Sequence, residues 1–490
     1  MNLTTAFLQS AERNATKAAV LWGDAERSYR SFADQSAWVT HHLRTRLGVK
    51  PGDRVGLWLR NCPEFISAFF GILGAGAIVV PINNFLKANE VGYILRDGGI
   101  DVLVTEGGME ETLERLTAAR PGLGLLRTET FEAAPAHPVE LPGLGQEDQD
   151  LAVIIYTSGT TGHPKGAMLS HGNLLHNVES CRHVFETVEV DRFALVLPMF
   201  HSFMLMVCVL LPLIVGGTIV LVKSLNPPKN IVREIMQHRA TVLPAIPQLF
   251  RALAHIPLPP DFPLRLCVSG AAPLPLEVLR EFSRQHTIPL VEGYGLSEAS
   301  PVVSVNPIRG IQKAGSIGLP ILGVEISIRN GENKELPRGE TGEVCVRGGN
   351  VMLGYWGKPE ETDSALRESW LHTGDVGYMD SDGYTYITDR KKDMLLVNGI
   401  NVYPREIEEV IYQYPGVREA AVIGKPDSRK GEHPVAFVSM NDGVVIDELA
   451  LFHFLKDRLA DYKLPRKVFQ LEMLPRNATG KILKTALREM

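Results

Sequence analysis

The stretch YTSGTTGHPKG, Tyr156 to Gly166, holds three glycines, four Thr or Ser hydroxyls and one lysine directly behind an apolar run. Glycine lets backbone N–H groups approach an anion closely, and successive N–H groups in a turn form a concave anion site. This composition predicts a loop that holds a polyphosphate. The residues expected to supply its donors and its charge are Thr157, Ser158, Gly159, Thr160, Thr161 and Lys165.

Two other kinds of loop have a similar composition. A P-loop NTPase needs G-x-x-x-x-G-K-[ST], but Pro164 stands where that pattern requires Gly, and Gly166 stands where it requires Ser or Thr. The P-loop pattern therefore fails, and with it a kinase or hydrolase that would produce ADP. An ordinary Gly/Thr surface loop without a ligand stays open as an alternative on composition alone.

Other polar residues are suited to a nucleotide. In VEGYGLSEASP, Tyr294 can stack on a base, and Glu298 is an oxygen ligand suited to Mg²⁺. Asp375, between glycine turns, can accept two ribose hydroxyls, and Arg390 follows a predicted strand. Each has a commoner role when taken alone, as a core aromatic, a solvated carboxylate, a turn cap or a linker residue. Lys481, in PRNATGKILK, is by itself an ordinary surface lysine.

These residues have to be positioned by a larger framework, which the apolar pattern indicates. Strand-like runs such as RVGLWL (54–59), AIVVPI (77–82) and DVLVT (101–105) alternate with helix-like segments, and the rhythm recurs as far as PLVEGYG (289–295). This alternation predicts mainly parallel sheets covered by helices, the α/β class. A linker rich in Pro and Gly is expected at 134–145.

Length and pattern together indicate two domains. A chain of 490 residues is too long for one ordinary core. A hairpin-rich stretch ends near Asp389, and a compact pattern of short strands and helices, including a helix that runs to Leu459, follows it. We expect an N-terminal domain over 1–390 and a C-terminal domain over 391–490.

Composition excludes several functional classes. The formal net charge is −6 with acidic and basic residues scattered along the chain, which argues against a nucleic-acid-binding protein. The 45% hydrophobic and 22% charged residues are ordinary for a soluble globular protein. The five cysteines never occur as C-x-x-C, so no zinc site or disulfide framework is expected, and a reducing cytosol fits. No targeting segment is predicted at the N-terminus.

The segment from Ala194 to Val222 has no charged residue and imitates a membrane span, which needs about 20 apolar residues. Pro198 and Pro212, together with two adjacent glycines, interrupt the run. We therefore expect a buried helix over about 202–215 followed by a buried strand over about 218–222.

In this order, the motifs YTSGTTGHPKG, GYGLSE, WLHTGDVG, DRKKDMLLVNGINVYPREIE and GKILK resemble those of the adenylate-forming enzymes. That superfamily includes acyl-CoA synthetases, firefly-luciferase-like proteins and the adenylation domains of peptide synthetases. The resemblance runs from about Ala6 to Lys484, and the motifs are highly specific as a set. It implies a large N-terminal domain of parallel-rich sheets flanked by helices plus a β-barrel-like part, followed by a small α+β C-terminal lid.

The resemblance also implies roles at matching positions. The stretch 157–165 would hold the β- and γ-phosphates of ATP, and Glu298 would bind Mg²⁺. Asp375 and Arg390 would contact the ribose. The positions that correspond to the adenine site and its flanks are Gly270, Ala271, Ala272, Glu292, Gly293, Tyr294, Gly295 and Ser297. Thr is commoner in relatives at position 297, and serine keeps the hydroxyl.

The implied reaction has two halves and uses ATP, Mg²⁺ and CoA. A carboxylate attacks the α-phosphate of ATP to give an acyl-adenylate and pyrophosphate, and a thiol, usually that of CoA, then displaces AMP. Lys481 corresponds to the catalytic lysine that bridges carboxylate and phosphate. Lys392 falls at the hinge position, and Gly399 lies where the family passes the pantetheine arm. A non-catalytic nucleotide-binding relative would be expected to lack Lys481 or Glu298, and this chain has both.

The apolar segment LPMFHSFMLMVCVLLPL (197–213) borders the acyl pocket in the family. Phe203 and Val207 are expected to line that pocket, and His201 is expected at its mouth, near the reacting carboxylate. The segment offers no cation for a second carboxylate, and its methionines suit a flexible chain, so a medium- or long-chain fatty acid is expected. An aryl acid stays open, because apolar walls fit both, and so does a purely structural core.

The acceptor and the partners follow from the same resemblance. The NGINVYPREIE stretch is more like CoA ligases, which favours CoA as the acceptor, whereas a free-standing enzyme that loads a carrier protein and a luciferase-like variant remain alternatives. We expect a small-molecule carboxylic acid and CoA as partners, no nucleic acid, no transmembrane segment, a cytoplasmic location and a homodimer.

Overall fold

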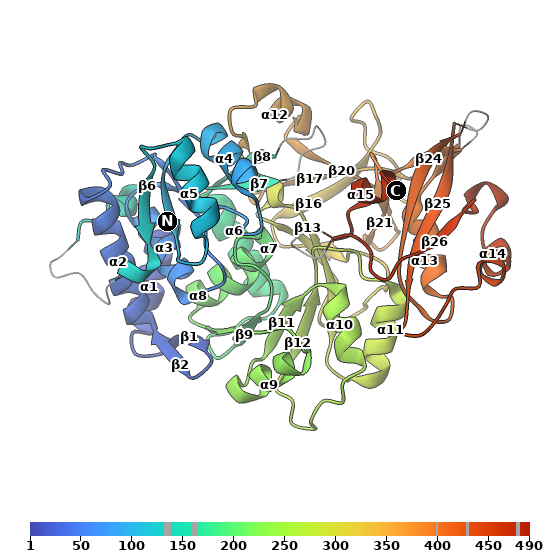
Figure 1. Cartoon of the computed structure of the whole chain (residues 1–490), viewed down its shortest axis with the longest axis horizontal. Coiled ribbons are helices and arrows are strands. Elements are labelled where there is room, and N and C mark those ends of the chain that lie inside the picture. The colour runs from blue at the N-terminus through green and yellow to red at the C-terminus, as the bar shows by residue number, and fades with distance from the viewer. Residues whose placement is uncertain (132–138, 158–163, 398–399, 428–430, 477–480) are drawn as a thin grey trace.

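The structure, a computed structural model, describes residues 1–131, 139–157, 164–397, 400–427, 431–476 and 481–490. Figure 1 shows helix-covered sheets built from the N-terminal and central parts of the chain, and a smaller sheet at the C-terminal end, drawn in orange and red. The expected class, α/β with a large N-terminal part and a smaller C-terminal domain, is confirmed.

The sheet that carries the glycine-rich stretch has seven strands in the order β18-β8-β7-β4-β3-β5-β6. The five strands from β7 to β6 in this order are parallel, as the alternating pattern predicts, and β8 and β18 add antiparallel pairs. The strands are β3 (Arg54–Leu57), β4 (Ile78–Pro81), β5 (Ile100–Thr105), β6 (Gly124–Arg127), β7 (Leu151–Thr157), β8 (Lys165–Ser170) and β18 (Gly354–Tyr355).

The second large sheet has nine strands in the order β15-β14-β13-β12-β11-β9-β10-β1-β2. Its six central strands, β13 to β1 in this order, are parallel. The strands are β1 (Ala18–Trp22), β2 (Ala25–Ser28), β9 (Arg192–Leu195), β10 (Thr218–Leu221), β11 (Val242–Ala245), β12 (Leu266–Ser269), β13 (Leu290–Gly295), β14 (Val302–Val305) and β15 (Leu319–Pro320).

Helices cover both faces of these sheets. In β4, Val79 belongs to the main core, whereas Ile78 and Val80 belong to a core on the opposite face. Because successive side chains of a strand point to opposite faces, a strand buried on both sides is apolar throughout. The main core includes α1 (Leu3–Arg13), α2 (Tyr29–Thr45), α3 (Pro63–Gly74) and α6 (His171–Val184). The outer faces are covered by α4 (Ala88–Asp97) and α5 (Glu110–Ala119) on the first sheet, and by α9 (Lys229–His238), α10 (Pro247–Ala254) and α11 (Leu276–Gln285) on the second.

The uncharged segment 194–222 forms the predicted buried helix followed by a buried strand. The helix consists of α7 (Ser202–Met204), η3 (Leu205–Leu210) and α8 (Leu211–Val215), and the strand is β10. The sequence did not predict that η3 is a π-helix, a wider turn that precedes Pro212, which has no N–H to donate. In the described part of the chain, no helix combines the length and apolar character that crossing a bilayer requires.

An antiparallel five-stranded sheet follows the nine-stranded sheet along the chain: β16 (Val324–Arg329), β17 (Gly342–Gly348), β20 (Trp370–Met379), β19 (Leu366–Arg367) and β21 (Thr385–Arg390). Beside it lies α12 (Pro359–Ala365). β21 ends at the predicted boundary residue Arg390, and residues 391–490 have a sheet and a core of their own. The domain boundary itself stays a prediction.

The C-terminal domain has the predicted mixture of strands and helices (Figure 1). Its strands are β22 (Leu395–Val397), β23 (Ile400–Val402), β24 (Val417–Asp427), β25 (Gly431–Met440) and β26 (Val468–Gln470). Its helices are α13 (Pro404–Tyr412), α14 (Glu448–Lys456) and α15 (Lys484–Arg488). The prediction that α14 reaches Leu459 was wrong, because a turn follows Lys456. Short 3₁₀ turns are η1 (Thr128–Thr130), η2 (Pro142–Gly145), η4 (Ser297–Ala299) and η5 (Asp461–Lys463).

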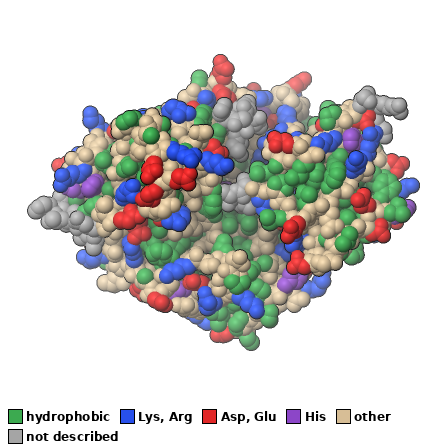
Figure 2. All heavy atoms as spheres, viewed as in Figure 1, with side chains coloured by type: hydrophobic (Ala, Val, Ile, Leu, Met, Phe, Trp, Pro, Cys, Tyr) green, Lys and Arg blue, Asp and Glu red, His purple; other side chains and the backbone are tan. Residues whose placement is uncertain are grey.

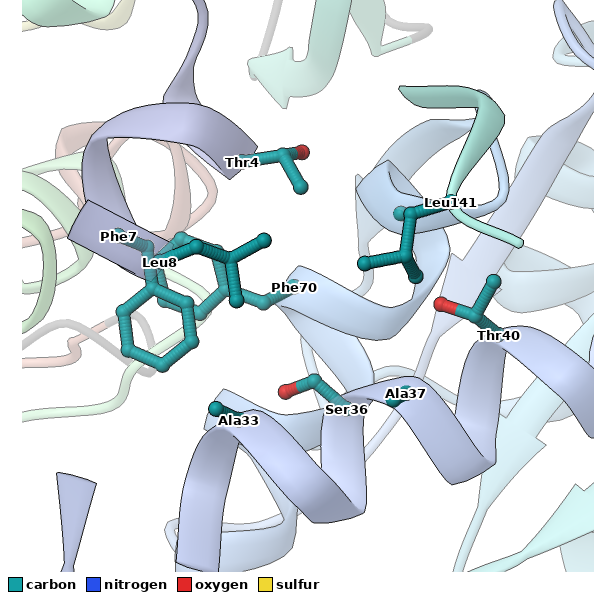
Figure 3. Close-up of a pocket in the computed structure, with 10 residues that line it drawn as sticks. Thr4, Phe7, Leu8, Ala33, Ser36, Ala37, Thr40, Phe70 and Leu141 are labelled. Atoms are coloured by element: carbon teal, nitrogen blue, oxygen red, sulfur yellow. The ribbon is translucent and has the colours of Figure 1, made fainter. Parts of the chain in front are cut away.

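A small cavity lies between α1, α2 and α3 (Figure 3). Thr4 and Ser36 line it, and their hydroxyl oxygens are buried with no hydrogen-bond partner among the described residues. Its volume of about 10 Å³ is the space of one water molecule, so it fits a bridging water and not a substrate. On the surface, Figure 2 shows basic and acidic side chains interspersed over the visible face.

Candidate functional site

The glycine-rich stretch connects two paired strands. Thr157 ends β7, Lys165 begins β8, and the two residues form a register pair of this hairpin. The Thr157 hydroxyl donates to Glu298 Oε1 over 3.2 Å. This bond joins the hairpin to η4, which lies between β13 and β14 of the nine-stranded sheet. The predicted phosphate contacts Ser158, Gly159, Thr160 and Thr161 lie outside the described residues.

Glu298 also accepts a hydrogen bond that the sequence analysis missed. The Tyr355 hydroxyl donates to Glu298 Oε1 over 3.0 Å, and the Lys165 ammonium lies 5.3 Å from the centre of the Tyr355 ring. One aromatic side chain therefore contacts both the candidate metal ligand and the candidate phosphate cation. Its only sequence signal is a Gly-Tyr-Trp run after a loop, which carries no chemistry by itself.

The predicted ribose contacts are brought together with the predicted base-stacking residue. Arg390 Nε lies 3.1 Å from Asp375 Oδ1, and the Tyr294 hydroxyl donates to Asp375 Oδ2 over 2.6 Å. Asp375 is only 4% exposed, so its carboxylate interacts with these protein donors rather than with bulk water. Burial, followed by the charge of Asp375, raises the pKa of Tyr294 well above its ordinary value, which keeps the phenol protonated as a donor.

Close packing leaves little room for a side chain at two glycines of the predicted adenine site. A Cβ at Gly295 would lie 2.1 Å from the Pro301 carbonyl oxygen, and a Cβ at Gly270 would lie 2.9 Å from the tip of the Phe203 ring. Ala271, the next residue, has a φ of +65° and turns the chain away from β12. The remaining predicted positions are Ala272 after this turn, Gly293 opposite Val305 on β14, and Ser297 at the start of η4.

The acid-pocket candidates lie next to the residues predicted to bind the nucleotide. The Ser202 and Ser297 hydroxyl oxygens are 3.0 Å apart, which joins α7 to η4. Phe203 is 7% exposed, and Val207 is completely buried within the π-helix. His201 caps α7, because its Nδ1 accepts the Phe203 N–H over 3.3 Å. The other ring nitrogen, Nε2, therefore carries the proton of the neutral imidazole.

Lys481 reaches the same region from the C-terminal domain. Its ammonium lies in electrostatic range of Asp375 and Arg390, and it also acts on His201. Burial lowers the pKa of Lys481 to about 8, Arg390 acts in the same direction, and Asp375 opposes them. Burial, with the positive charge of Lys481, lowers the pKa of His201 to about 4, so the imidazole is neutral at pH 7.

Two further predicted residues lie at the junction with the C-terminal domain. The buried Glu292 carboxylate accepts the Leu274 N–H over 3.0 Å, and burial raises its pKa to about 7 against the opposing charge of Arg405 in α13. Lys392, the hinge candidate, is the second residue after β21, and burial and then the charge of Arg390 lower its pKa. Gly399 lies outside the described residues.

The site has a donor set that suits Mg²⁺ held together with a phosphate. Among the residues that the structure places, no three His, Cys, Asp or Glu side chains gather into a metal cage. Magnesium usually binds through one or two carboxylates plus substrate phosphates rather than in an all-protein cage. Glu298, beside the Thr157 hydroxyl at the end of the glycine-rich stretch, fits that pattern.

Electrostatic interactions connect these candidate residues, because Glu298 acts on Arg390 and Asp375 acts on Lys481. Lys165 and Lys481 lie far apart along the chain, as do Glu298 in η4 and Asp375 in β20. Positive charges fixed near the point where two anions meet reduce the repulsion between them. The geometry therefore suits the joining of an anionic acid to a nucleotide phosphate.

Comparison with known proteins agrees with this chemistry. The chain matches the AMP-binding enzyme family over residues 7–356 and the AMP-binding enzyme C-terminal domain over residues 406–481. A long-chain-fatty-acid–CoA ligase of Bacillus subtilis (strain 168) is 35% identical over 529 residues, which cover 99% of this chain and 94% of that protein. A feruloyl-CoA synthase of an Amycolatopsis species is 38% identical over 477 residues, which cover 96% and 95% of the two chains.

A solved structure shows the same fold over the whole chain. The anthranilate CoA ligase AuaEII in complex with anthranoyl-AMP aligns with a TM-score of 0.92 and 30% identity, covering 100% of this chain and 97% of that one. The chain therefore belongs to the AMP-binding enzymes, the adenylate-forming superfamily that its motifs resemble, and the comparisons support an acyl-CoA synthetase.

Proposed function

We propose that this protein activates an apolar carboxylic acid with ATP and transfers the acyl group to CoA, releasing pyrophosphate and AMP. The observation that supports this best is the position of Lys481, which belongs to the C-terminal domain yet acts electrostatically on both Asp375 and His201. An ammonium there can contact an acid carboxylate and an α-phosphate at once.

In the first half-reaction, a carboxylate oxygen of the acid attacks the α-phosphorus of ATP. The bond from that phosphorus to the β-phosphate oxygen breaks, and pyrophosphate leaves with the electron pair. Lys481 would reduce the repulsion between the two anions, and Lys165 would hold the leaving phosphates. Asp375 and Arg390 would fix the ribose, so that the phosphate chain lies in line with the attacking acid.

Glu298 and the Thr157 hydroxyl would hold Mg²⁺ beside the phosphates, where the bound ion would supply charge neutralisation. This chain's own contribution is orientation. The donors Thr157 and Tyr355 both approach Glu298 Oε1 and hold the carboxylate in one direction.

In the second half-reaction, the CoA sulfur, as thiolate, attacks the acyl carbon, the carbon–oxygen bond to AMP breaks, and AMP leaves as an anion. Lys481 has no role in this step, and its ammonium would occupy space that the thiol needs. Rotation of the C-terminal domain about Lys392 would withdraw Lys481 and bring the Gly399 segment to the adenylate. CoA is the proposed acceptor because the similar curated proteins are CoA ligases.

Two acid classes are candidates. A medium- or long-chain fatty acid is supported by the apolar, uncharged segment 197–213 and by the fatty-acid ligase among the relatives. An aryl acid is supported by the aromatic ring of Phe203, whose edge lies close to Gly270, and by the feruloyl-CoA synthase and the anthranilate CoA ligase. A cytoplasmic location and a homodimer stay predictions from the sequence.

Product analysis tests the proposal. Purified protein with ATP, Mg²⁺ and CoA is offered short, medium, long and aryl acids, and pyrophosphate, AMP and acyl-CoA are measured. Stoichiometric formation of all three with an apolar acid is expected. If the acyl-adenylate accumulates in the presence of CoA but is consumed when a phosphopantetheinylated carrier protein is added, the carrier protein and not CoA is the acceptor. ADP formation, or no product with any acid, would contradict the proposed reaction.

A further inference from the structure

Tyr355 stands between two functional groups that come from different parts of the fold. Its hydroxyl donates to Glu298 Oε1 over 3.0 Å, and its ring centre lies 5.3 Å from the Lys165 ammonium. A cation over an aromatic face at this distance is attracted by the negative face of the ring. The two contacts use different parts of one side chain, so they can be removed separately.

The segment around Tyr355 is itself fixed to both groups through the backbone. The Met352 N–H donates to the Glu298 carbonyl over 2.9 Å, and the Trp356 N–H donates to the Gly166 carbonyl over 2.8 Å. Tyr355 pairs with Ala167 in the β18–β8 ladder, and its own N–H donates to Thr362 Oγ1 over 2.9 Å. Residues 352–356 thus connect η4 to the start of β8, and the Tyr355 side chain extends that connection to the charged atoms.

We propose that Tyr355 is a positioning residue that aligns the carboxylate of Glu298 with the ammonium of Lys165, so that Mg²⁺ and the triphosphate of ATP are bound together. This inference rests on the proposed function for the identity of the nucleotide. It assigns a role to a side chain that neither the sequence motifs nor the position of Lys481 indicates.

The hydrogen-bond pattern on Glu298 explains how the alignment works. Within the described parts of the chain, the donors that meet this carboxylate, Thr157 and Tyr355, both approach Oε1. Two donors on one oxygen restrain rotation of the carboxylate and leave Oε2 directed elsewhere, available to a cation. The Tyr355 ring holds the Lys165 ammonium 5.3 Å from its centre, so the same side chain that orients Glu298 also contacts the candidate phosphate cation.

Two substitutions separate this role from simple packing. Tyr355→Phe keeps the ring, the strand pairing and the contact with Lys165, but removes the donor to Glu298. Tyr355→Leu removes both contacts. Tyr378→Phe is the matched control, because Tyr378 stacks on Tyr386 with ring centres 4.9 Å apart in the β20–β21 hairpin, away from these groups.

The experiment measures nucleotide binding by the full-length protein, with no turnover required. Isothermal titration gives the Kd of ATP with Mg²⁺ and with EDTA, and electron paramagnetic resonance of Mn²⁺ reports the metal directly. For Tyr355→Phe we expect the Kd of ATP to rise about tenfold with Mg²⁺, the low end of the range for losing one hydrogen bond to a charged group, and to stay unchanged with EDTA. For Tyr355→Leu we expect weaker binding in both buffers, about threefold with EDTA because the Lys165 contact is lost.

A double-mutant cycle tests whether Tyr355 acts through Glu298. In a Glu298→Gln background, Tyr355→Phe should add no further weakening in Mg²⁺, because the group it positions is no longer a charged metal ligand. Additive losses would overturn the proposal. An unchanged Kd in Tyr355→Phe, or an equal rise with Mg²⁺ and with EDTA, would also overturn it and leave Tyr355 as a packing residue.

The test can fail independently of the proposed function. Wild-type protein that binds Mg²⁺–ATP but releases no pyrophosphate with any acid would contradict the proposed ligase reaction, whereas the difference between Tyr355→Phe and wild type in Mg²⁺ would still decide the role of Tyr355. The melting temperature of each of the three variants is measured as well. Values within a few degrees of wild type show that the binding differences come from folded protein.

Discussion

Asp375 and Arg390 face each other across the β20–β21 hairpin, with Arg390 Nε 3.1 Å from Asp375 Oδ1. The second carboxylate oxygen accepts a 2.6 Å hydrogen bond from Tyr294, which belongs to another sheet. The carboxylate is therefore oriented by the protein before a ligand binds. A preformed acceptor of this kind reduces the ordering that a nucleotide must undergo on binding.

This relationship predicts the effect of Asp375→Asn. The amide cannot compensate the Arg390 charge in a buried position, and a ribose would lose a charged acceptor. We expect the Kd of ATP to rise about 10- to 100-fold, the range for a hydrogen bond to a charged group. Isothermal titration measures it. The control is Asp382→Asn. Asp382 lies in the turn of the same hairpin, where it forms an exposed ion pair with Lys313, and its substitution should leave the Kd unchanged.

The position of Lys481 predicts a separation of the two half-reactions. Lys481→Ala should lower ATP–pyrophosphate exchange by about 10²- to 10³-fold, the usual cost of removing one electrostatic stabiliser of a transition state. Thioester formation from a supplied acyl-adenylate should persist. Lys467→Ala, at an exposed position of the same domain, provides the control. Equal loss of both half-reactions would refute the assignment of Lys481 to adenylation.

The pKa of Lys481 predicts a pH dependence for one half-reaction only. Burial and neighbouring Arg390 lower this pKa to about 8, so the ammonium is lost as the pH rises through about 8. Because adenylation needs the charged form, its rate should fall above this pH, whereas thioester formation from supplied adenylate should not show that decline. Rapid-quench assays of each half-reaction between pH 6 and about 9.5 test this. A parallel decline of both halves would point to a different titrating group.

Glu292 predicts a stability change with pH. Its pKa in the folded protein is raised from 4.5 to about 7, mainly by burial. The folded state therefore holds this proton more tightly than the unfolded state, and stability is lost as the pH rises through that interval, by at most about 3 kcal/mol. Glu292→Gln keeps an acceptor for the Leu274 N–H and carries no charge, so its melting temperature should exceed that of wild type by more at pH 8 than at pH 5. Glu340→Gln, at an exposed position, should show no such difference.

The close approach of Phe203 to Gly270 predicts a change in acid preference. Phe203→Ala removes the ring that a Cβ at Gly270 would touch at 2.9 Å, and enlarges the space beside α7. Extra room of this size should shift the ratio of kcat/KM between a bulky and a small acid about 10- to 100-fold toward the bulky one. Phe203→Leu should have a smaller effect in the same direction. An unchanged ratio across the acid panel would place the acyl pocket elsewhere.

Much of the framework could be predicted from local patterns. The strands at 54–57, 78–81 and 100–105, and the buried helix and strand within 194–222, were predicted from apolar periodicity and chain breakers, because these signals act over a few residues. The π-helical turn before Pro212 and the end of α14 were not, since helix geometry and helix ends depend on packing that periodicity does not encode.

For the site, the sequence by itself determined which chemical groups are present and, through the order of its motifs, the superfamily to which they belong. It could not determine that Tyr355 contacts Glu298 and Lys165 together, that Glu292 lies buried at the junction with α13, or that Lys481 acts on His201. These relationships join side chains far apart along the chain. The tertiary structure alone decided them, because distances across sheets depend on how the layers pack and burial sets the charge of each group.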